Sequence, residues 1–474
     1  MLFNSISYIL FLPLVFLLYW YVFSKNLRGQ NIFLFVVSYI FYAWWDWRFL
    51  FLLMLSTLID YTFGLLVYNR TKRKKLFLWL SVVNNLAVLF FFKYYNFFIE
   101  SAVDLLKQFG FNGDGPVLHI LLPVGISFYT FHGMSYVFDI YNGKVKPTKN
   151  FVDYALFVSF FPLLVAGPIE RAHHLLPQLQ QKRTFNYKQA VEGMRLMLWG
   201  FFKKIVIADT LAGGVNDIFQ EYFAFPGSTL VLGIVFFSFQ IYCDFSGYTD
   251  IALGSAKLFG IELLTNFKFP YFSRDIAEFW RRWHISLSSW FRDYLYIPLG
   301  GSRVGKWKAL RNTFIIFIIS GFWHGANWTY LFWGFLHAVY FAPLLLLNRN
   351  RKYTSEITAY NSKLPNWKEL WQMLLTFALV TFAWIFFRAP SMDFAWKYIR
   401  GIGHNLLGDP GHFINYIPYV IIFLVADWWQ RRNERQVLTI STRWVRYTVY
   451  FLMAMVILLH YHYIDQTEFI YFKF

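Results

Sequence analysis

The chain has 474 residues, of which 57% are hydrophobic, 23% aromatic and only 15% charged. This composition excludes an ordinary soluble globular protein, because apolar stretches of about 20 residues, each able to cross a hydrocarbon core of about 30 Å, recur along the chain. The net charge of +18 does not indicate nucleic-acid binding, since Lys and Arg gather in short loops between apolar runs. The sequence predicts an all-α, polytopic integral membrane protein.

The first apolar run, Ile6 to Phe23, has no basic stretch before it and no small-x-small cleavage site after it. We therefore interpret it as a retained first helix rather than a signal peptide. Hydropathy predicts about 11–12 helical segments in a single domain, 1–474. The candidate membrane segments are roughly 6–23, 31–45, 48–68, 76–99, 119–141, 152–168, 190–212, 228–245, 311–347, 366–387, 413–429 and 444–461. Segments 119–141 and 311–347 contain Gly, Pro or His and are expected to be broken or re-entrant.

The basic loops predict how the chain is oriented in the membrane. The densest loop, NRTKRKK (69–75), is placed in the cytoplasm, which puts the start of the chain outside. The loop QRRNERQ (430–436) is cytoplasmic by the same rule, so the span 444–461 runs outward. The C-terminal tail, 462–474, is therefore expected at the outer face.

The six carboxylates expected within or near membrane segments also need an explanation. They are Asp60, Asp139, Asp209, Asp244, Asp250 and Asp427. Asp244 and Asp250 stand out because they lie close together in YCDFSGYTDIALG. Such groups cannot face lipid, so they either form internal ion pairs or line an aqueous path. The neighbouring Cys243 is the single cysteine of the chain, which excludes an intrachain disulfide, and its apolar surroundings favour packing over a nucleophilic role.

The segment 271–311 differs from the rest because it is aromatic, basic and too charged to span a bilayer. It is predicted to be an amphipathic segment that lies in the membrane interface or lines a wet cavity. On a helix, Arg281, His284 and Ser288 would share one polar face. The same pattern is typical of an interfacial helix with tryptophan anchors and arginines that reach toward water.

A second histidine, His324, lies in the apolar run IISGFWHGANW, where a titratable side chain is expensive and commonly functional. Ser320, His324 and Asn327 are spaced to share one helix face. The glycines on either side, Gly321 and Gly325, would allow a neighbouring helix to approach closely. A histidine bonded to a neighbouring carbonyl would fit equally well. Since no cluster of Cys and His accompanies either histidine, no metal site is expected.

Taken together, these motifs resemble the membrane-bound O-acyltransferase superfamily. The resemblance rests on RRWHISLSSWFRDYLYIPLGG (281–301) and FIISGFWHGANWTYLFWG (317–334), supported by LPVGISFYTFHGMSYVFDIY, AGPIER, DFSGYTDIALG and FAWIFFRA. It extends from end to end and is most specific for the bacterial polysaccharide O-acetyltransferases of the alginate O-acetylase and peptidoglycan O-acetyltransferase type. The family's essential histidine corresponds to His324, and its second signature position to His284.

The resemblance implies an enzyme that transfers acyl groups. A hydroxyl that attacks a thioester needs a base, and histidine, with an ordinary pKa of about 6.5, suits that role. His324 is the implied catalytic base and His284 a second catalytic residue. The supporting residues are Asn327, Ser320, Asp244 and Asp250. No permanently bound cofactor is expected, and the implied donor substrate is acetyl-CoA.

The phosphates of CoA need cations. The candidates are Arg281, Arg282, Arg292, Arg303 and Lys306. Ordinary cytoplasmic loop charge explains each of them equally well. The resemblance further implies a bacterial inner membrane, a central tunnel that joins its two sides, and a polysaccharide acceptor that is alginate-like, cellulose or peptidoglycan. A periplasmic or extracellular acetyltransferase partner of the SGNH type is also implied.

The sequence ends in FIYFKF. Its aromatic residues are typical of an anchor at the membrane interface. The spacing Phe-x-Tyr-x-x-Phe also resembles the tail of the small peptide in the D-alanine transfer system for teichoic acids, in which the tyrosine is thought to accept the acyl group. By that resemblance, Tyr471 would be an acyl relay.

Two other classes of function fit parts of the sequence. A multispan transporter would use the broken segments and buried carboxylates as a substrate path, but no internal repeat of the kind such folds show is visible. A superfamily relative that acylates lipids or proteins would share the histidine motifs.

Overall fold

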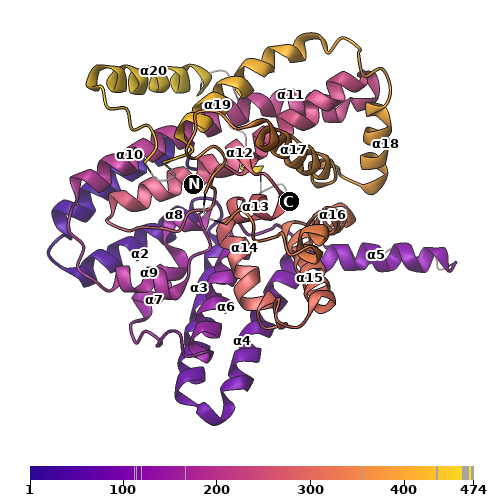
Figure 1. Ribbon diagram of the computed structural model, residues 1–474. Coiled ribbons are helices and arrows are strands. Elements are labelled where there is room, and N and C mark those ends of the chain that lie inside the picture. The colour runs from indigo at the N-terminus through magenta and orange to yellow at the C-terminus, as the bar shows by residue number, and fades with distance from the viewer. Residues whose placement is uncertain are drawn as a thin grey trace. The chain divides into compact units, whose positions relative to one another are not determined.

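The computed structural model of the chain describes residues 1–110, 113, 115–118, 120–165, 167–354, 356–433, 436–461 and 469–470. Among these residues all regular secondary structure is helical, and they contain no strand (Figure 1). The predicted all-α class is confirmed. The contacts between residues group the chain into two compact units, which we describe separately.

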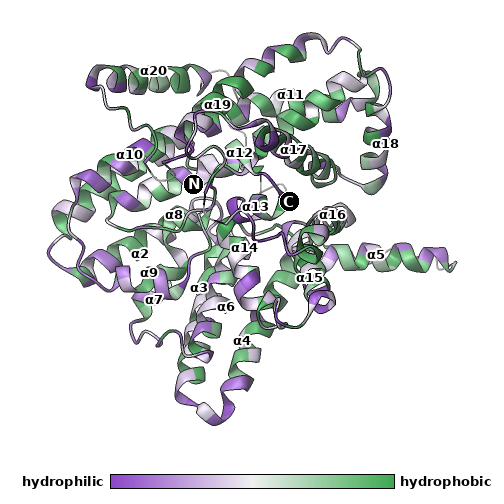
Figure 2. Cartoon of the chain, viewed as in Figure 1, coloured by the Kyte–Doolittle hydropathy of each residue, from purple (hydrophilic) through white to green (hydrophobic). Residues whose placement is uncertain are grey.

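The first unit comprises 1–2, 6–186 and 258–263. Its helices are α1 Ile6–Leu17, η1 Leu18–Val22, α2 Leu27–Ala43, α3 Arg48–Asn69, η2 Thr71–Arg73, α4 Lys74–Leu89, η3 Phe90–Tyr94, α5 Tyr95–Gln108, α6 Ile126–Tyr141, α7 Phe151–Ser159, α8 Phe161–Leu164 and α9 Ala172–Leu179. Figure 2 shows α3 and α4 as mainly hydrophobic rods joined at a hydrophilic turn. That turn is the densest basic loop of the sequence.

One predicted carboxylate, Asp60, lies in the interior of this unit, on α3. It is 1% exposed and accepts hydrogen bonds from the Ser81 hydroxyl (2.7 Å) and the Asn85 amide (2.8 Å), both on α4. On α6, Gly133 leaves the room that the carboxylate fills, since a Cβ there would overlap Asp60. Internal hydrogen bonding is therefore how this group avoids lipid.

The second unit comprises 3–5, 187–257 and 264–474. Its helices are α10 Tyr187–Phe201, η4 Phe202–Ala208, α11 Asp209–Gln220, η5 Tyr222–Ala224, α12 Gly227–Leu258, η6 Pro270–Phe272, α13 Ile276–Arg282, α14 Ile285–Phe291, η7 Arg292–Tyr296, α15 Lys306–His324, α16 Trp328–Leu346, α17 Trp367–Arg388, α18 Met392–Ile402, η8 Gly411–Tyr416, α19 Ile417–Gln430 and α20 Arg443–Tyr461. Every residue of the candidate site belongs to this unit.

Within the described ranges, seven helices are long and apolar enough to cross a membrane. They are Arg48–Asn69, Thr71–Gln108, Gly227–Leu258, Trp328–Leu346, Trp367–Arg388, Gly411–Gln430 and Arg443–Tyr461. Other predicted segments are shorter or interrupted. Segment 152–168 forms the short helices α7 and α8, which part at Phe160, just before Pro162. Nine residues of helix span only about 14 Å, too little to cross a bilayer alone.

Candidate active site

The backbone between α13 and α14 turns sharply at His284. This residue adopts a left-handed conformation (φ 42°, ψ 55°), which is uncommon for residues other than glycine and asparagine. The buried Asn266 holds the turn, since its carbonyl accepts from the Ile285 N–H (2.9 Å) and its side chain accepts from the Ser286 hydroxyl (2.6 Å). Backbone strain of this kind, about 1–3 kcal/mol, persists only where its surroundings enforce it.

The predicted polar face of Arg281, His284 and Ser288 is wrong. Because the helix breaks at Trp283 and His284, the three residues do not share one continuous helix. The left-handed turn instead directs the imidazole of His284 into the interior, where it is 1% exposed.

The predicted grouping of Ser320, His324 and Asn327 holds only in part. Ser320 and His324 lie four residues apart on α15, but the helix ends at His324 and the backbone is extended at Gly325. Asn327 instead caps α16: its side-chain oxygen accepts from the Thr329 N–H (3.0 Å), and its amide donates to the Pro390 carbonyl (2.9 Å). The expectation that Asn327 shares a helix face with His324 is therefore wrong.

Helices α15 and α16 form a closely packed hairpin. A Cβ on Gly321 would overlap the carbonyl of Tyr330, and a Cβ on Gly334 would overlap the carbonyl of Phe317. The close approach predicted for Gly321 is confirmed. Gly325 faces the ring of Tyr330, which a Cβ there would also overlap. This packing fixes the end of α15 and with it His324.

The structure brings His284 and His324 against the same indole, that of Trp323. The ring centroid of Trp323 lies 6.0 Å from that of His284 and 4.8 Å from that of His324, which is 3% exposed. His324 also contacts Trp333 (5.2 Å), and His284 contacts Phe245 edge-on (4.7 Å, 89°). Forty residues of sequence separate two imidazoles that belong to one buried aromatic cluster.

His284 combines burial with unused hydrogen-bonding capacity. Across the residues that the structure describes, neither of its ring nitrogens has a hydrogen-bond partner. Burial lowers the pKa of His284 to about 3, so the imidazole is neutral at physiological pH. Because buried polar groups are nearly always hydrogen-bonded, a strained, unpartnered histidine is typical of a site that receives a ligand.

A cavity of about 210 Å³ lies among α13, α14, η7, α15 and α16. Its described lining residues are Trp280, Ser288, Phe291, Arg292, Tyr296, Ser302, Thr313, Ile316, Phe317, Ser320, Phe341, Asn350 and Arg351. Aromatic walls with a few polar groups are typical of ligand pockets. The lining reaches Ser320, one helical turn before His324, and includes two guanidinium groups.

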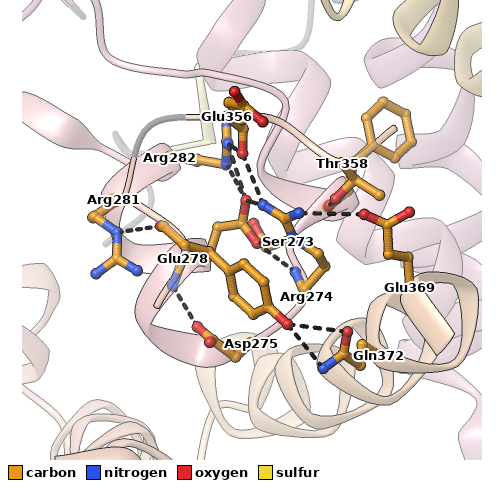
Figure 3. Close-up of polar contacts among 12 residues, drawn as sticks. Ser273, Arg274, Asp275, Glu278, Arg281, Arg282, Glu356, Thr358, Glu369 and Gln372 are labelled. Atoms are coloured by element: carbon orange, nitrogen blue, oxygen red, sulfur yellow. Dashed lines mark hydrogen bonds and ion pairs between the residues drawn. The ribbon is translucent and has the colours of Figure 1, made fainter. Parts of the chain in front are cut away.

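Two of the arginines predicted to bind phosphate have other partners. Arg282 donates to the buried carboxylate of Glu278 (3.0 Å), which also accepts from Arg274 (3.0 Å), as Figure 3 shows. Arg281 donates to the carbonyls of Asn350 (2.9 Å) and Tyr353 (3.1 Å). Arg282 is paired within the segment 271–311, and Arg281 joins that segment to residues 350–353. The phosphate-binding expectation for these two arginines is therefore not supported by their contacts.

Of the remaining basic candidates, Arg292 alone is among the described residues that line the cavity. Its guanidinium is exposed and donates to Asp293 (2.8 Å). Arg303 and Lys306 are exposed, and Lys306 donates to the Leu346 carbonyl (3.3 Å). Arg351, which sequence reasoning missed, lines the cavity and donates to Ser302 (3.2 Å). Its place in a basic loop, NRNRK, gave no signal that separated it from ordinary loop charge.

A third histidine, His337, was also missed. It is fully buried on α16, and its Nδ1 accepts from the indole N–H of Trp280 (3.2 Å), a wall of the cavity. Its ring lies 4.8 Å from Trp333, which contacts His324. The signal for it was present, because a histidine inside an apolar segment is unusual.

The carboxylates Asp244 and Asp250, on α12, are both ion-paired. The π-helix η4 presents two consecutive lysines to them: Lys204 lies 2.7 Å from Asp244, and Lys203 lies 2.7 Å from Asp250. Lys204 also pairs with Asp209 (2.7 Å). Of the two alternatives left open by the sequence, internal ion pairing is the one observed.

The predicted relay residue, Tyr471, lies outside the described residues, as does most of the tail. The two residues before it are described. Phe469 is fully buried against Tyr248 (4.6 Å), and the Ile470 N–H donates to Asp244 (2.7 Å). At Phe469 the segment is buried in the protein rather than exposed as an interfacial anchor.

Comparison with known proteins agrees with these features. The model of the membrane-bound O-acyltransferase family matches residues 39–364. The probable alginate O-acetylase of Pseudomonas aeruginosa is 40% identical over 397 residues, 83% of this chain and 73% of the relative. The peptidoglycan O-acetyltransferase of Helicobacter pylori is 36% identical over 433 residues, which are 85% of this chain and 80% of the relative. The teichoic acid D-alanyltransferase of Bacillus subtilis is 29% identical over 288 residues, which are 57% of this chain and 70% of the relative. The chain therefore belongs to the membrane-bound O-acyltransferase family and is a multi-pass membrane acyltransferase.

Proposed function

We propose that this acyltransferase moves an acetyl group from cytoplasmic acetyl-CoA toward hydroxyl groups of an exported cell-envelope polysaccharide. The observation that supports this most is the buried pair His284 and His324 around Trp323, beside a cavity that carries Arg292 and Arg351. The two guanidinium groups suit an anionic CoA donor. The names of the relatives, an alginate O-acetylase and a peptidoglycan O-acetyltransferase, support an acetyl group and a polysaccharide acceptor.

In the proposed reaction, His324 acts as general base. Its neutral imidazole takes the proton from the attacking hydroxyl as the oxygen bonds to the thioester carbonyl carbon. The tetrahedral intermediate then breaks its C–S bond, and the CoA sulfur receives the proton from the imidazolium. His284 would line the same tunnel on the donor side, where the N–H of its neutral imidazole can donate to the carbonyl oxygen of the bound thioester.

His284→Ala is expected to lower acetyl transfer, but by less than the loss of His324 does. The imidazole is proposed to orient the donor rather than to take the proton. The transfer rate should therefore fall by less than the factor of about 10²–10⁴ that a general base contributes. The matched variant His284→Asn retains a polar side chain and tolerates the left-handed backbone, so it should retain more activity. Initial rates with purified variants test this, and a wild-type rate in His284→Ala would remove His284 from the site.

The acetyl group is proposed to pass through Tyr471 before it reaches sugar. The phenol would lose its proton to His324 and attack the thioester, giving an aryl ester and CoA thiol. A serine of an SGNH-type partner in the periplasm, or the sugar hydroxyl itself, would then attack this ester and restore the phenol. The protein would accordingly work in the bacterial inner membrane.

Tyr471→Phe is expected to abolish transfer to polysaccharide while leaving the protein folded, because it retains the aromatic ring and removes only the nucleophile. Mass spectrometry of the wild type after incubation with acetyl-CoA should find an added acetyl group on the peptide that contains Tyr471. Undiminished polysaccharide acetylation by Tyr471→Phe would eliminate the relay without affecting the assignment of His324.

The donor and acceptor can be tested with purified protein and labelled acetyl-CoA. We expect release of CoA thiol and incorporation of label into one of three offered polymers: alginate, cellulose or peptidoglycan. Label found instead in lipid, or in a protein other than the enzyme itself, would favour the alternative acyltransferase. The absence of thioester cleavage with every acceptor would contradict an acetyl-CoA-dependent enzyme.

A further inference from the structure

The segment Phe469–Ile470 is held against the middle of α12, more than two hundred residues earlier in the chain. The Ile470 N–H donates to Asp244 Oδ2 at 2.7 Å, in a buried hydrogen bond. The Phe469 ring is fully buried and lies 4.6 Å from Tyr248 and 5.6 Å from Phe245. This segment is therefore held by one hydrogen bond to a carboxylate and by contacts with two aromatic rings.

The carboxylate of Asp244 is itself held in place. Its other oxygen lies 2.7 Å from Lys204 Nζ, and that lysine, 1% exposed, also pairs with Asp209 (2.7 Å). A buried ion pair needs additional hydrogen bonds to satisfy its remaining acceptor positions. The backbone N–H of Ile470 supplies one of them to the Asp244 carboxylate, and such charge-assisted bonds are stronger than neutral ones.

The aromatic contacts of Phe469 adjoin the candidate active site. Phe245, which contacts Phe469, also packs edge-on against His284 with their ring centroids 4.7 Å apart. One aromatic ring thus separates the held segment from the strained, buried histidine.

We propose that Asp244 is a positioning residue, and that the Asp244–Lys204 pair forms a clasp that fixes the backbone at Ile470 beside the active site. The clasp stands on the contacts above. Its consequence for catalysis rests on the proposed function: Tyr471 is the next residue in the sequence, so release of the clasp is expected to lower relay through it.

The clasp can be tested by thiol labelling of the full-length protein. Ile470→Cys retains the backbone N–H, and Cys243→Ala removes the only native thiol. In this background a maleimide should react slowly, because residue 470 is buried. Adding Asp244→Ala should raise the labelling rate about tenfold or more, the effect of losing one hydrogen bond to a charged group.

Two matched variants make the comparison sharper. Asp244→Asn retains a carbonyl oxygen that can accept from the N–H, so its labelling rate should lie between those of the parent and the alanine variant. Asp250→Ala breaks the neighbouring ion pair with Lys203 but retains both the Asp244–Lys204 pair and the hydrogen bond from Ile470 to Asp244, so its labelling rate should equal that of the parent. Equal rates for Asp244→Ala and the parent, or fast labelling of the parent, would overturn the clasp.

If Asp244→Ala does not fold, the donor can be removed instead. Ile470→Pro eliminates the N–H and leaves the ion pair intact, whereas Ile470→Ala retains the N–H. The clasp predicts at least tenfold lower acetyl transfer in the proline variant than in the alanine variant at the same melting temperature. Where mass spectrometry finds the acetyl group on the Tyr471 peptide of the wild type, equal transfer by the two variants would overturn the clasp. Labelling reports on the clasp alone. If the Tyr471→Phe experiment refuted the relay, the labelling result would still decide whether the clasp exists.

Discussion

His324→Ala is expected to lower acetyl transfer by about 10²–10⁴-fold, the contribution of a general base, while the protein stays folded and inserted in the membrane. His324 ends α15 on a hairpin whose glycine contacts fix its position, and its ring packs between Trp323 and Trp333. Its removal leaves a space the size of an imidazole in a large aromatic cluster. The chemical effect should therefore exceed the structural one.

The matched variant is His324→Gln, which fills much of the same space but cannot act as a base near neutral pH. Both variants should lose activity alike, although the glutamine variant should unfold at a temperature closer to that of the wild type. Rates with labelled acetyl-CoA and melting temperatures in detergent separate the two effects. Near-normal turnover in either variant would refute the assignment, and loss of folded protein in both would favour a packing role for His324.

Glu278→Ala is expected to cause the largest loss of stability, about 3–5 kcal/mol, which is typical when one partner of a buried ion pair is removed. The carboxylate is fully buried and accepts from Arg274 (3.0 Å) and Arg282 (3.0 Å), as in Figure 3. Arg274 retains a second carboxylate, Glu369, at 3.3 Å, whereas Arg282 would retain only backbone carbonyls. The uncompensated charge of Arg282 should dominate the effect.

Because Glu278 lies on α13, immediately before the turn at His284, its loss should also reduce activity. Thermal and denaturant unfolding of the variant measure the stability. The exposed pair of Lys397 and Asp393 (2.6 Å) provides the control, since Asp393→Asn breaks an ion pair in solvent and should leave unfolding unchanged. A Glu278→Ala protein that unfolds like the control would show that this buried cluster contributes little to stability.

The sequence predicted the features that depend on local composition and periodicity. Apolar length identified α3 and α12 as membrane helices, and the four-residue spacing correctly placed Ser320 and His324 on one helix. The grouping failed at Asn327 because that helix ends at His324 and the backbone is extended at Gly325. The prediction that His284 lies on a polar helix face with Arg281 and Ser288 was wrong because the backbone at His284 is left-handed. Such a conformation is rare in a residue other than glycine, and no local pattern predicts it.

The rest of the candidate site depends on contacts between distant parts of the chain. The partners of Asp244 are Lys204 and the backbone of Ile470, and neither pairing leaves a mark in the local sequence. In the same way, charge alone could not separate Arg281, which holds two carbonyls, from Arg292, which lines the cavity. Only the folded arrangement distinguishes a basic residue that stabilises the protein from one that is available to a ligand.

The most direct test of the proposed function uses sealed proteoliposomes with acetyl-CoA, labelled in both its acetyl and its CoA parts, on one side and polysaccharide on the other. Because the protein is proposed to pass an acetyl group, and not CoA, across the membrane, the acetyl label should appear on the polysaccharide while the CoA label stays on its original side. The His324→Ala protein should transfer neither label. Passage of both labels together would indicate a transporter and would contradict the proposed acetyl transfer, as would transfer by His324→Ala at the wild-type rate.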